Sequence, residues 1–334
     1  MENYWIQLKT LIDQSQKIVL TTHVRPDGDG LGAEAALFSY FESLGKIVRI
    51  INVSPLPEAF DYMNKDARFE TFNTTIHAHI LENADCTIIL DCNQLDRTEE
   101  MAPYVERTKG NIVVIDHHLY PGDFADLLCI DINSCATGEM VYDFITFHSG
   151  KMTVSQDAAT GIYTSIMTDT GNFRFPRTTP AVHRKTAYLI ESGVEPSEIY
   201  GWVNEQRTLQ SLQLQGLFLS QIRTAYDGRL AYSVVKKSDF DRFGATLEDS
   251  EGFVKYLLSV KGVVMGILLI EQPYGYKLSF RSKGDIDVNR LASQYSGGGH
   301  KNASGGKMEE MTDHAIARLI ADAEPILNAM EITE

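Results

Sequence analysis

The stretch THVRPDGDG at residues 22–30 places three side chains that commonly bind metals, His23, Asp27 and Asp29, within seven positions. Two carboxylates this close repel each other unless a cation lies between them, and a buried unpaired charge is expensive. Because Asp27 and Asp29 flank a glycine, we expect an extended stretch that aims both carboxylates toward one side. The spacing therefore predicts one half of a metal site.

Three later segments add candidate ligands: Asp91 in LDCNQLDR, Asp116, His117 and His118 in VVIDHH, and Asp169 in IMTDTG. Asp91 is the natural bridge between two ions, since a carboxylate has two oxygens to share. Mixed carboxylate and imidazole ligands suit Mn²⁺, and Mg²⁺ less well; zinc stays open. Two ions about 3.5–4 Å apart ionise a bridging water and neutralise a phosphate oxygen, so the predicted reaction class is phosphoester hydrolysis.

Each candidate is weak evidence when taken alone. An aspartate at the end of a strand is more often a helix N-cap than a ligand, and a single buried histidine is more often an ordinary core residue. The hypothesis depends on the combination, because six residues with ligand chemistry fall at the ends of neighbouring predicted elements.

The elements that would position these residues are strands rich in Val and Ile. They are predicted at 17–23, 46–52, 86–92 and 111–118. A helix-like stretch at 31–45, with Gly45 as its C-cap, makes the first unit β-α-β, so we expect a largely parallel sheet flanked by helices. Strand ends of such a sheet converge on one ligand crevice, and a helical pattern over 158–175 brings Asp169 to it.

The pattern of predicted secondary structure changes near residue 196. Residues 196–225 are mostly helix-like and suggest a helical linker between a catalytic domain at 1–195 and a smaller α/β domain at 226–334. Within the second domain the predicted elements are strands at 229–235, 262–272 and 275–282, a glycine cluster at 296–306 and a terminal helix at 312–329.

The length and composition of the chain exclude several classes of function. The chain has 334 residues, 43% of them hydrophobic, which favours two domains. Its 30 basic and 45 acidic residues give a net charge of −15, which argues against a broad surface for long nucleic acid. No run approaches the ~18 apolar residues of a membrane span, and no secretory signal is evident, so we expect a cytoplasmic protein without membrane partners. The four cysteines form no CxxC pair and indicate core thiols.

Four of these motifs together resemble a known family. HVRPDGDGLG, LDCNQLDR, VVIDHH and IMTDTG are similar to the motifs of DHH phosphoesterases, and FRS at 280–282 with GGGH at 297–300 resembles the appended DHHA1 domain. The resemblance covers nearly the whole chain. The short two-domain form is most similar to the oligoribonuclease and 3′-phosphoadenosine-5′-phosphate phosphatase group of that family.

The resemblance implies a site with two Mn²⁺ ions that share one bridging carboxylate. The implied ligands are His23, Asp27 and Asp91 for one ion, and Asp29, Asp91, His117 and Asp169 for the other. Together with Asp91, the implied catalytic residues are His118, which would face the scissile phosphate, and Asp116, which would orient the histidine pair. Whether Cys92 and Asn93 tune the site stays open.

The second domain is expected to bind the substrate. The glycines before His300 free the backbone for a nest-like phosphate site; a tight turn is the alternative, and the family likeness favours the nest. Arg281 would clamp a phosphate, helped by Lys283 or Lys301. The predicted substrate-binding residues are Arg281, Gly297, Gly298, Gly299 and His300.

These features lead to one function hypothesis and several alternatives. The first is Mn²⁺-dependent hydrolysis of short single-stranded RNA to mononucleotides, with removal of the 3′-phosphate of 3′-phosphoadenosine 5′-phosphate, by a protein that does not bind long duplexes and forms a homodimer. The alternatives are hydrolysis of linear or cyclic dinucleotides such as pApA, pGpG and c-di-AMP, family II pyrophosphatase activity, a RecJ-like exonuclease, and a nucleotide sensor without catalysis. The GGGH cluster disfavours the pyrophosphatase, and the length and acidity of the chain disfavour the exonuclease.

Overall fold

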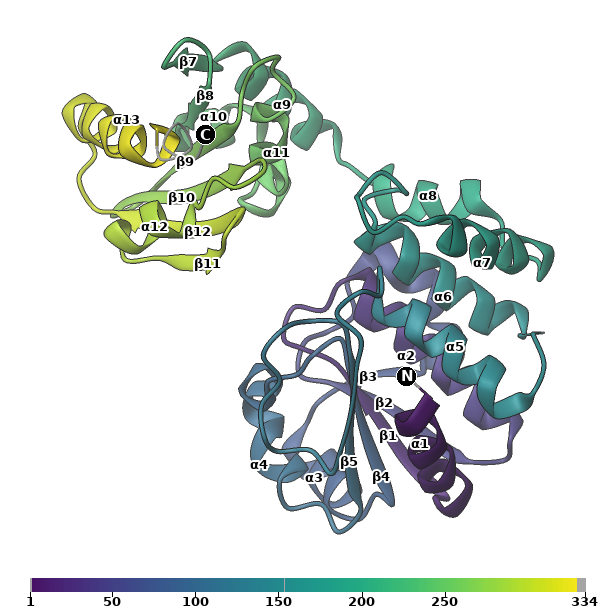
Figure 1. The fold of residues 1–334 in the computed structure, drawn as a ribbon. Helices are drawn as coiled ribbons and strands as arrows, with labels where there is room; N and C mark the ends of the chain where they lie inside the picture. Colours follow the sequence, from purple (N-terminus) through teal and green to yellow (C-terminus); the bar gives the residue numbers. More distant parts are fainter. Residues whose placement is uncertain (1, 153, 329–334) are drawn as a thin grey trace. The chain divides into compact units, whose positions relative to one another are not determined.

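The computed structural model describes residues 2–152 and 154–328, and the chain divides into two compact units, Met1–Gln206 and Arg207–Glu334 (Figure 1). The segment 196–225, predicted as a helical linker, contributes to both. Helix α8 (Pro196–Asn204) belongs to the first unit, whereas α9 (Leu209–Ser220) packs into a core cluster of the second. Among the described residues, no helix has the length and apolarity needed to cross a bilayer.

The first unit is built on a six-stranded sheet in the order β3-β2-β1-β4-β5-β6, with every neighbouring pair parallel. This confirms the predicted parallel sheet. Its strands are β1 (Lys17–Thr21), β2 (Ile47–Asn52), β3 (Phe69–Thr71), β4 (Cys86–Leu90), β5 (Asn111–Asp116) and β6 (Leu127–Ile130). The chain order reverses at β1, which pairs with both β2 and β4, and the crevice beyond the carboxyl ends of β1 and β4 is where such sheets bind ligands.

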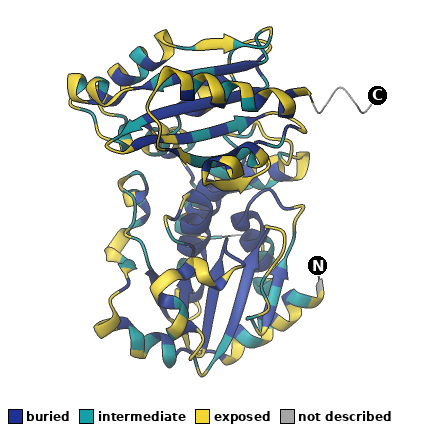
Figure 2. Ribbon diagram, turned by 90° about the vertical axis from the view of Figure 1, so that its left-hand side faces the viewer, coloured by how far each residue is buried: buried dark blue, intermediate teal, exposed yellow. Residues whose placement is uncertain are grey.

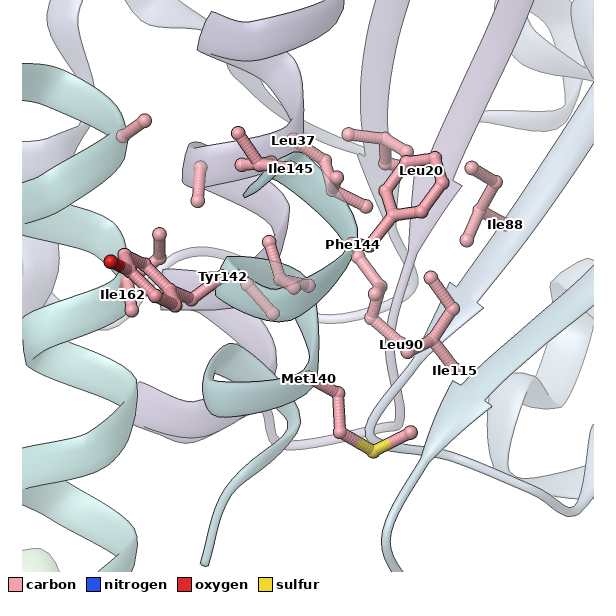
Figure 3. Close-up of a cluster of buried hydrophobic side chains, with 14 of the residues drawn as sticks. Leu20, Leu37, Ile88, Leu90, Ile115, Met140, Tyr142, Phe144, Ile145 and Ile162 are labelled. Atoms are coloured by element: carbon pink, nitrogen blue, oxygen red, sulfur yellow. The ribbon is translucent and has the colours of Figure 1, made fainter. Parts of the chain in front are cut away.

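Both faces of this sheet are covered by helices, which explains why its strands are nearly continuous apolar runs (Figure 2). Along β1, Ile18 and Leu20 join the core under α1, α2, α5 and α6, whereas Val19 joins the core under α3 and α4. Figure 3 shows Phe144 of α5 and Leu90 of β4 among the side chains of the larger core. The helices are α1 (Glu2–Gln14), α2 (Gly28–Ser43), α3 (Thr74–Glu82), α4 (Ala102–Val105), α5 (Thr137–Ser149), α6 (Gln156–Asp169) and α7 (Pro180–Glu191).

Helix α2 begins earlier than predicted, and this corrects the expected extended stretch around the first two aspartates. Asp27 is the N-cap, its Oδ1 accepts a hydrogen bond from the Asp29 N–H at 3.0 Å, and Asp29 lies in the first helical turn. The glycines beside these aspartates allow close packing at the start of the helix. A Cβ on Gly30 would lie 2.3 Å from Thr22 Oγ1, and a Cβ on Gly28 would lie 2.5 Å from Thr168 Cγ2.

The second unit contains a mixed sheet in the order β11-β12-β10-β9-β8-β7, in which only β8 and β9 pair in parallel within the described residues. Its strands are β7 (Arg223–Ala225), β8 (Leu230–Val235), β9 (Met265–Gln272), β10 (Gly275–Ser282), β11 (Gly298–His300) and β12 (Ala303–Met308). Its further helices are α10 (Lys237–Phe243), α11 (Phe253–Leu257), α12 (Asn289–Ala292) and α13 (Asp313–Asn328). Short 3₁₀ segments in the chain are η1 (Glu58–Met63), η2 (Lys65–Ala67), η3 (Leu95–Met101), η4 (Glu248–Ser250) and η5 (Ser293–Tyr295).

The two faces of the second sheet differ. Leu278 and Phe280 of β10 pack into the core that includes α13, whereas Lys277, Ser279 and Arg281 alternate with them and face the other side. On that other side, α9, α10 and α11 pack against apolar residues of β8 and β9. The side chains of Lys277 and of Lys307 on β12 are exposed.

The GGGH cluster forms neither the predicted nest-like loop nor a tight turn. Residues 298–300 form the short edge strand β11, paired antiparallel with β12. The glycines allow the two strands to approach closely, since a Cβ on Gly297 would lie 2.0 Å from the Gly305 carbonyl oxygen. The glycine cluster therefore reflects backbone crowding within a sheet.

Candidate metal centre

The carboxyl ends of three adjacent strands carry three of the predicted ligands: His23 follows β1, Asp91 follows β4 and His117 follows β5. The start of α2 and the end of α6 supply the others. Ligand atoms lie within 4.8 Å of one another in three groups: His23, Asp27 and Asp91; Asp29, His117 and Asp169; and Asp91, Asp116, His117 and His118. All six predicted metal ligands are therefore brought together at one edge of the sheet.

Asp91 lies at the centre of these groups. Its Oδ2 is 3.5 Å from His23 Nε2, and its Oδ1 is 3.7 Å from His117 Nε2. The two carboxylate oxygens thus face two different sets of ligands. The residue is buried, and its φ of +54° is in the left-handed region, which is rare for a side-chain-bearing residue and typical of constrained functional sites.

His117 presents one ring nitrogen to the acids and the other to the backbone. Its Nε2 is 3.4 Å from Asp29 Oδ2 and 3.5 Å from Asp169 Oδ2, while its Nδ1 is 3.2 Å from the Ser134 carbonyl oxygen. A proton on Nδ1 donated to that carbonyl leaves the Nε2 lone pair free for a cation. Arg177 Nη1 also donates to the Ser134 carbonyl oxygen, at 3.3 Å.

Asp29 is both a candidate ligand and a cap. Its Oδ2 accepts from the Thr137 N–H at 2.8 Å and its Oδ1 from the Gly138 N–H at 3.1 Å, at the first turn of α5. The Ser165 hydroxyl also donates to Oδ1. These bonds fix the carboxylate and leave lone pairs for a metal, so Asp29 can support the first turn of α5 and bind a cation at the same time.

The electrostatics of the site favour a bound cation. Burial, followed by repulsion from Asp29 and Asp27, raises the pKa of Asp91 well above its ordinary value. Burial raises the pKa of Asp29 as well, and raises the pKa of Asp169 to about 6. These carboxylates resist being charged together without a counter-ion. A divalent metal supplies that charge, and the mixture of imidazole and carboxylate donors fits one.

His118 and Asp116 form a separate pair beside the acids. The His118 Nδ1 lies 2.7 Å from Asp116 Oδ1, and this hydrogen bond raises the pKa of His118. Asp116 Oδ1 also accepts from the backbone N–H groups of His117 and His118, at 2.7 and 3.2 Å. Asp116 therefore orients the His118 ring directly, whereas the ring of His117 is held by the Ser134 carbonyl.

The residues after Asp91 hold the loop that follows the histidine pair. The Asn93 Nδ2 donates to the carbonyl oxygens of His118 and Leu119, at 3.0 and 3.3 Å, and the Gly122 N–H donates to the Asn93 carbonyl at 2.8 Å. Cys92 is buried, with its Sγ 3.2 Å from the Gln94 carbonyl oxygen. Asn93 thus holds the backbone at His118 in place, a role that the sequence alone did not predict.

In the second unit, Arg281 and His300 share one face of the sheet. Arg281 pairs with Ala303 of β12, and Ala303 pairs with His300 of β11, so the three side chains project from the same side. Arg281 is half-buried, its Nη1 donates to the Phe280 carbonyl oxygen at 2.9 Å, and burial lowers its pKa. His300 is exposed.

The two lysines considered as helpers are engaged elsewhere. Lys283 Nζ donates to the carbonyl oxygens of Leu258 and Val263, at 2.5 and 3.0 Å. Lys301 forms an ion pair with Asp285 at 2.6 Å.

Comparison with known proteins gives the same division of the chain. The sequence matches the DHH family, N-terminal domain, over residues 17–166 and the DHHA1 domain over residues 227–329. The bifunctional oligoribonuclease and PAP phosphatase NrnA of Thermus thermophilus is 29% identical, with 95% of this chain and 93% of that protein covered. NrnA of Bacillus subtilis is 28% identical, with 94% and 96% covered.

A solved structure extends the likeness to three dimensions. The crystal structure of an exopolyphosphatase-related protein from Bacteroides fragilis is 30% identical and superimposes with a TM-score of 0.92, covering 98% of both chains. The class defined by the fold and the site is that of metal-dependent phosphoesterases. Within this class, the chain belongs to the DHH/DHHA1 family.

Proposed function

We propose that this enzyme hydrolyses short oligoribonucleotides to mononucleotides and removes the 3′-phosphate of 3′-phosphoadenosine 5′-phosphate, with two Mn²⁺ ions as cofactor. The observation that carries the proposal is the position of Asp91, whose two oxygens face separate ligand groups. The names of the two NrnA relatives, which match over most of their length, support these substrates.

The six ligands divide into two sets around that bridge. His23, Asp27 and Asp91 would hold one ion; Asp29, Asp91, His117 and Asp169 would hold the other. When bound, the pair of ions supplies activation of the attacking water and neutralisation of charge on the phosphate. Mn²⁺ accepts both imidazole and carboxylate, and Mg²⁺ is less suited to the histidines.

The chain's own residues position the phosphate. The hydrogen bond from His118 Nδ1 to Asp116 raises the pKa of His118 and so favours the form that also carries a proton at Nε2. The Nε2–H donates to a phosphate oxygen and favours the charge that develops there. In the second unit, Arg281 and His300 bind a phosphate of the same substrate from one sheet face.

A substrate panel tests the proposal. The purified chain, first stripped of metal, is supplied with Mn²⁺, Mg²⁺ or Zn²⁺ and given RNA of two to five nucleotides, 3′-phosphoadenosine 5′-phosphate, pApA, pGpG, c-di-AMP and inorganic polyphosphate. We expect mononucleotides from the short RNAs and AMP from the bisphosphate, fastest with Mn²⁺. Inertness toward both of these with turnover of cyclic dinucleotide or polyphosphate would overturn the substrate assignment, and metal-independent turnover would overturn the site.

A further inference from the structure

The sheet face that carries Arg281 also carries a second basic row. Along β10, Lys277 and Ser279 alternate with core residues and project to the same side as Arg281. Strand pairing extends each position across the sheet into three rows: Arg281, Ala303 and His300; Ser279, Gly305 and Gly298; and Lys277 with Lys307. We call this surface the three-row face.

The outer row places two like charges directly opposite each other. Lys277 of β10 pairs with Lys307 of β12, and both side chains are exposed. Directly opposed like charges destabilise an antiparallel pair. Within residues 2–152 and 154–328, neither lysine has an ion pair within 4.0 Å, although the chain has 45 acidic residues. Lys277 interacts electrostatically with Glu248, but only beyond that distance. A like-charged pair without a close acidic partner in an acidic protein points to an anionic ligand.

The two basic rows border one hollow. A cavity of about 320 Å³ is lined by Lys277, Ser279 and Arg281 of β10 and, opposite them, by Lys255 of α11 and Glu251 before it. Three cations therefore line one cavity with a single carboxylate. The middle row consists of Ser279, Gly305 and Gly298, so no large side chain separates the lysines from Arg281.

The distance between the basic rows decides what kind of anion can use both. Lys277 is four residues from Arg281 along the strand, which corresponds to about 13–14 Å. At physiological ionic strength the Debye length is about 8 Å. A single phosphate held at Arg281 is therefore largely screened from the lysines, and the lysine row contributes to affinity only if the ligand carries a further phosphate near it.

We propose that Lys277 and Lys307, with Lys255 at the edge of the cavity, form a second phosphate subsite that binds a phosphodiester further along the oligonucleotide whose first phosphate lies at Arg281 and His300. The subsite rests on the proposed function, and it makes the affinity of the second unit increase with substrate length. A ligand with its phosphates only at the first row gains nothing from the lysines.

Equilibrium dialysis of the full chain in EDTA tests the subsite without turnover. The probes are ³²P-labelled pApA and the five-nucleotide RNA pA₅, and the variant is Lys277→Gln/Lys307→Gln. The control variant, Lys237→Gln/Lys261→Gln, removes the same charge from two exposed lysines of the same unit that lie outside the three-row face. Melting temperatures check folding, and relief of the opposed charges should keep that of the test variant at least as high as wild type.

We expect the Kd of pA₅ to rise roughly fivefold at 0.15 M salt in the test variant, while that of pApA changes less than twofold. The slope of log affinity against log salt for pA₅ should become shallower by about 0.7 for each lysine that no longer neutralises a phosphate. Equal rises in Kd for both probes, an equal effect of the control variant, or no change for pA₅ would each overturn the subsite. Length-dependent binding by a protein that hydrolyses neither probe with Mn²⁺ would overturn the proposed reaction and leave the subsite standing.

Discussion

The two units place their functional side chains in opposite environments. In the first, His23, Asp29, Asp91 and His117 are 1–6% exposed at the end of a sheet covered on both faces. In the second, His300 and the lysines of the three-row face are exposed on a sheet surface. Chemistry at a phosphorus atom requires charges that are dry and fixed, because solvent weakens them. Recognition of a multiply charged chain tolerates solvent, because several weak contacts add up.

The means of support differ accordingly. Asp29 is held by two N–H groups of α5 and a hydroxyl of α6, so loss of its carboxylate would disturb helix packing as well as metal binding. Arg281 is held by strand register and by one bond to the neighbouring carbonyl. Substitutions in the first site should therefore mix catalytic and structural effects, whereas those in the second should separate cleanly.

The largest expected effect is that of Asp91→Asn. The amide cannot bridge two cations, so we expect loss of bound metal by mass spectrometry and loss of several kcal/mol of transition-state stabilisation, roughly 10³-fold in kcat. In EDTA the same variant should melt at a higher temperature than wild type, because repulsion with Asp29 and Asp27 is relieved. Asp96→Asn, an exposed neighbour, is the control. Near-normal turnover by Asp91→Asn would refute the bridge.

The next largest effect is expected at Glu34, a buried acid that is not among the candidate metal ligands. Glu34 of α2 is fully buried, its Oε2 accepts from Asn52 Nδ2 at 2.9 Å, and Asn52 Oδ1 in turn accepts from the Thr22 N–H at 3.0 Å, one residue before His23. Burial raises the pKa of Glu34 to about 8. Glu34 belongs to none of the three groups of candidate metal ligands, so no bound metal would stabilise its charged form. We therefore expect this carboxyl to stay protonated at neutral pH.

Glu34→Gln should therefore change the pH dependence of stability. The pKa of this acid is higher in the folded protein than in the unfolded chain. Below the unfolded-state pKa the acid costs no stability, and between the unfolded-state and folded-state pKa values the free energy of unfolding falls as the pH rises. Between pH 5 and pH 8 the wild type should lose about 3 kcal/mol relative to the variant, an order-of-magnitude figure from that shift. Urea unfolding at both pH values measures this, with exposed Glu42→Gln on the same helix as control. If the difference in unfolding free energy between wild type and Glu34→Gln were the same at pH 5 and pH 8, the raised pKa of Glu34 would be contradicted.

The grouping of the candidate metal ligands could be predicted from the sequence, because the signal for each residue lies in its own short segment. Each candidate follows an apolar run, and parallel topology makes such strand ends meet, so His23, Asp91 and His117 could be placed at one edge before any coordinates. The supporting residues could not be found in this way. Ser134, Ser165 and Arg177 carry no local signal, and their roles arise from contacts between segments far apart in the chain.

Glycine was the main source of error, since it has two different uses. At the start of α2 and just before β11 it permits close packing, at Gly30 against Thr22 and at Gly297 against β12, whereas the sequence suggested an extended stretch at the first place and a nest or a turn at the second. The strands β3, β6, β7, β11 and β12 were also not predicted. The first four have only three or four residues, too few to show a periodicity, and β12 (ASGGKM) lacks the Val and Ile that marked the other strands. The register of β12 in turn defines the three-row face.

The smallest expected effect separates binding from chemistry in the second unit. Arg281→Gln removes a fork of donors from a half-buried position on β10 of the second unit, whereas all the candidate metal ligands belong to the first unit. We therefore expect KM for a short RNA to rise about tenfold with kcat little changed. Arg290→Gln, an exposed arginine of the same unit, is the control, and an unchanged melting temperature shows that the fold is intact. A fall in kcat at constant KM would mean that Arg281 acts in the transition state, and the contrast between a catalytic first unit and a binding second unit would then fail.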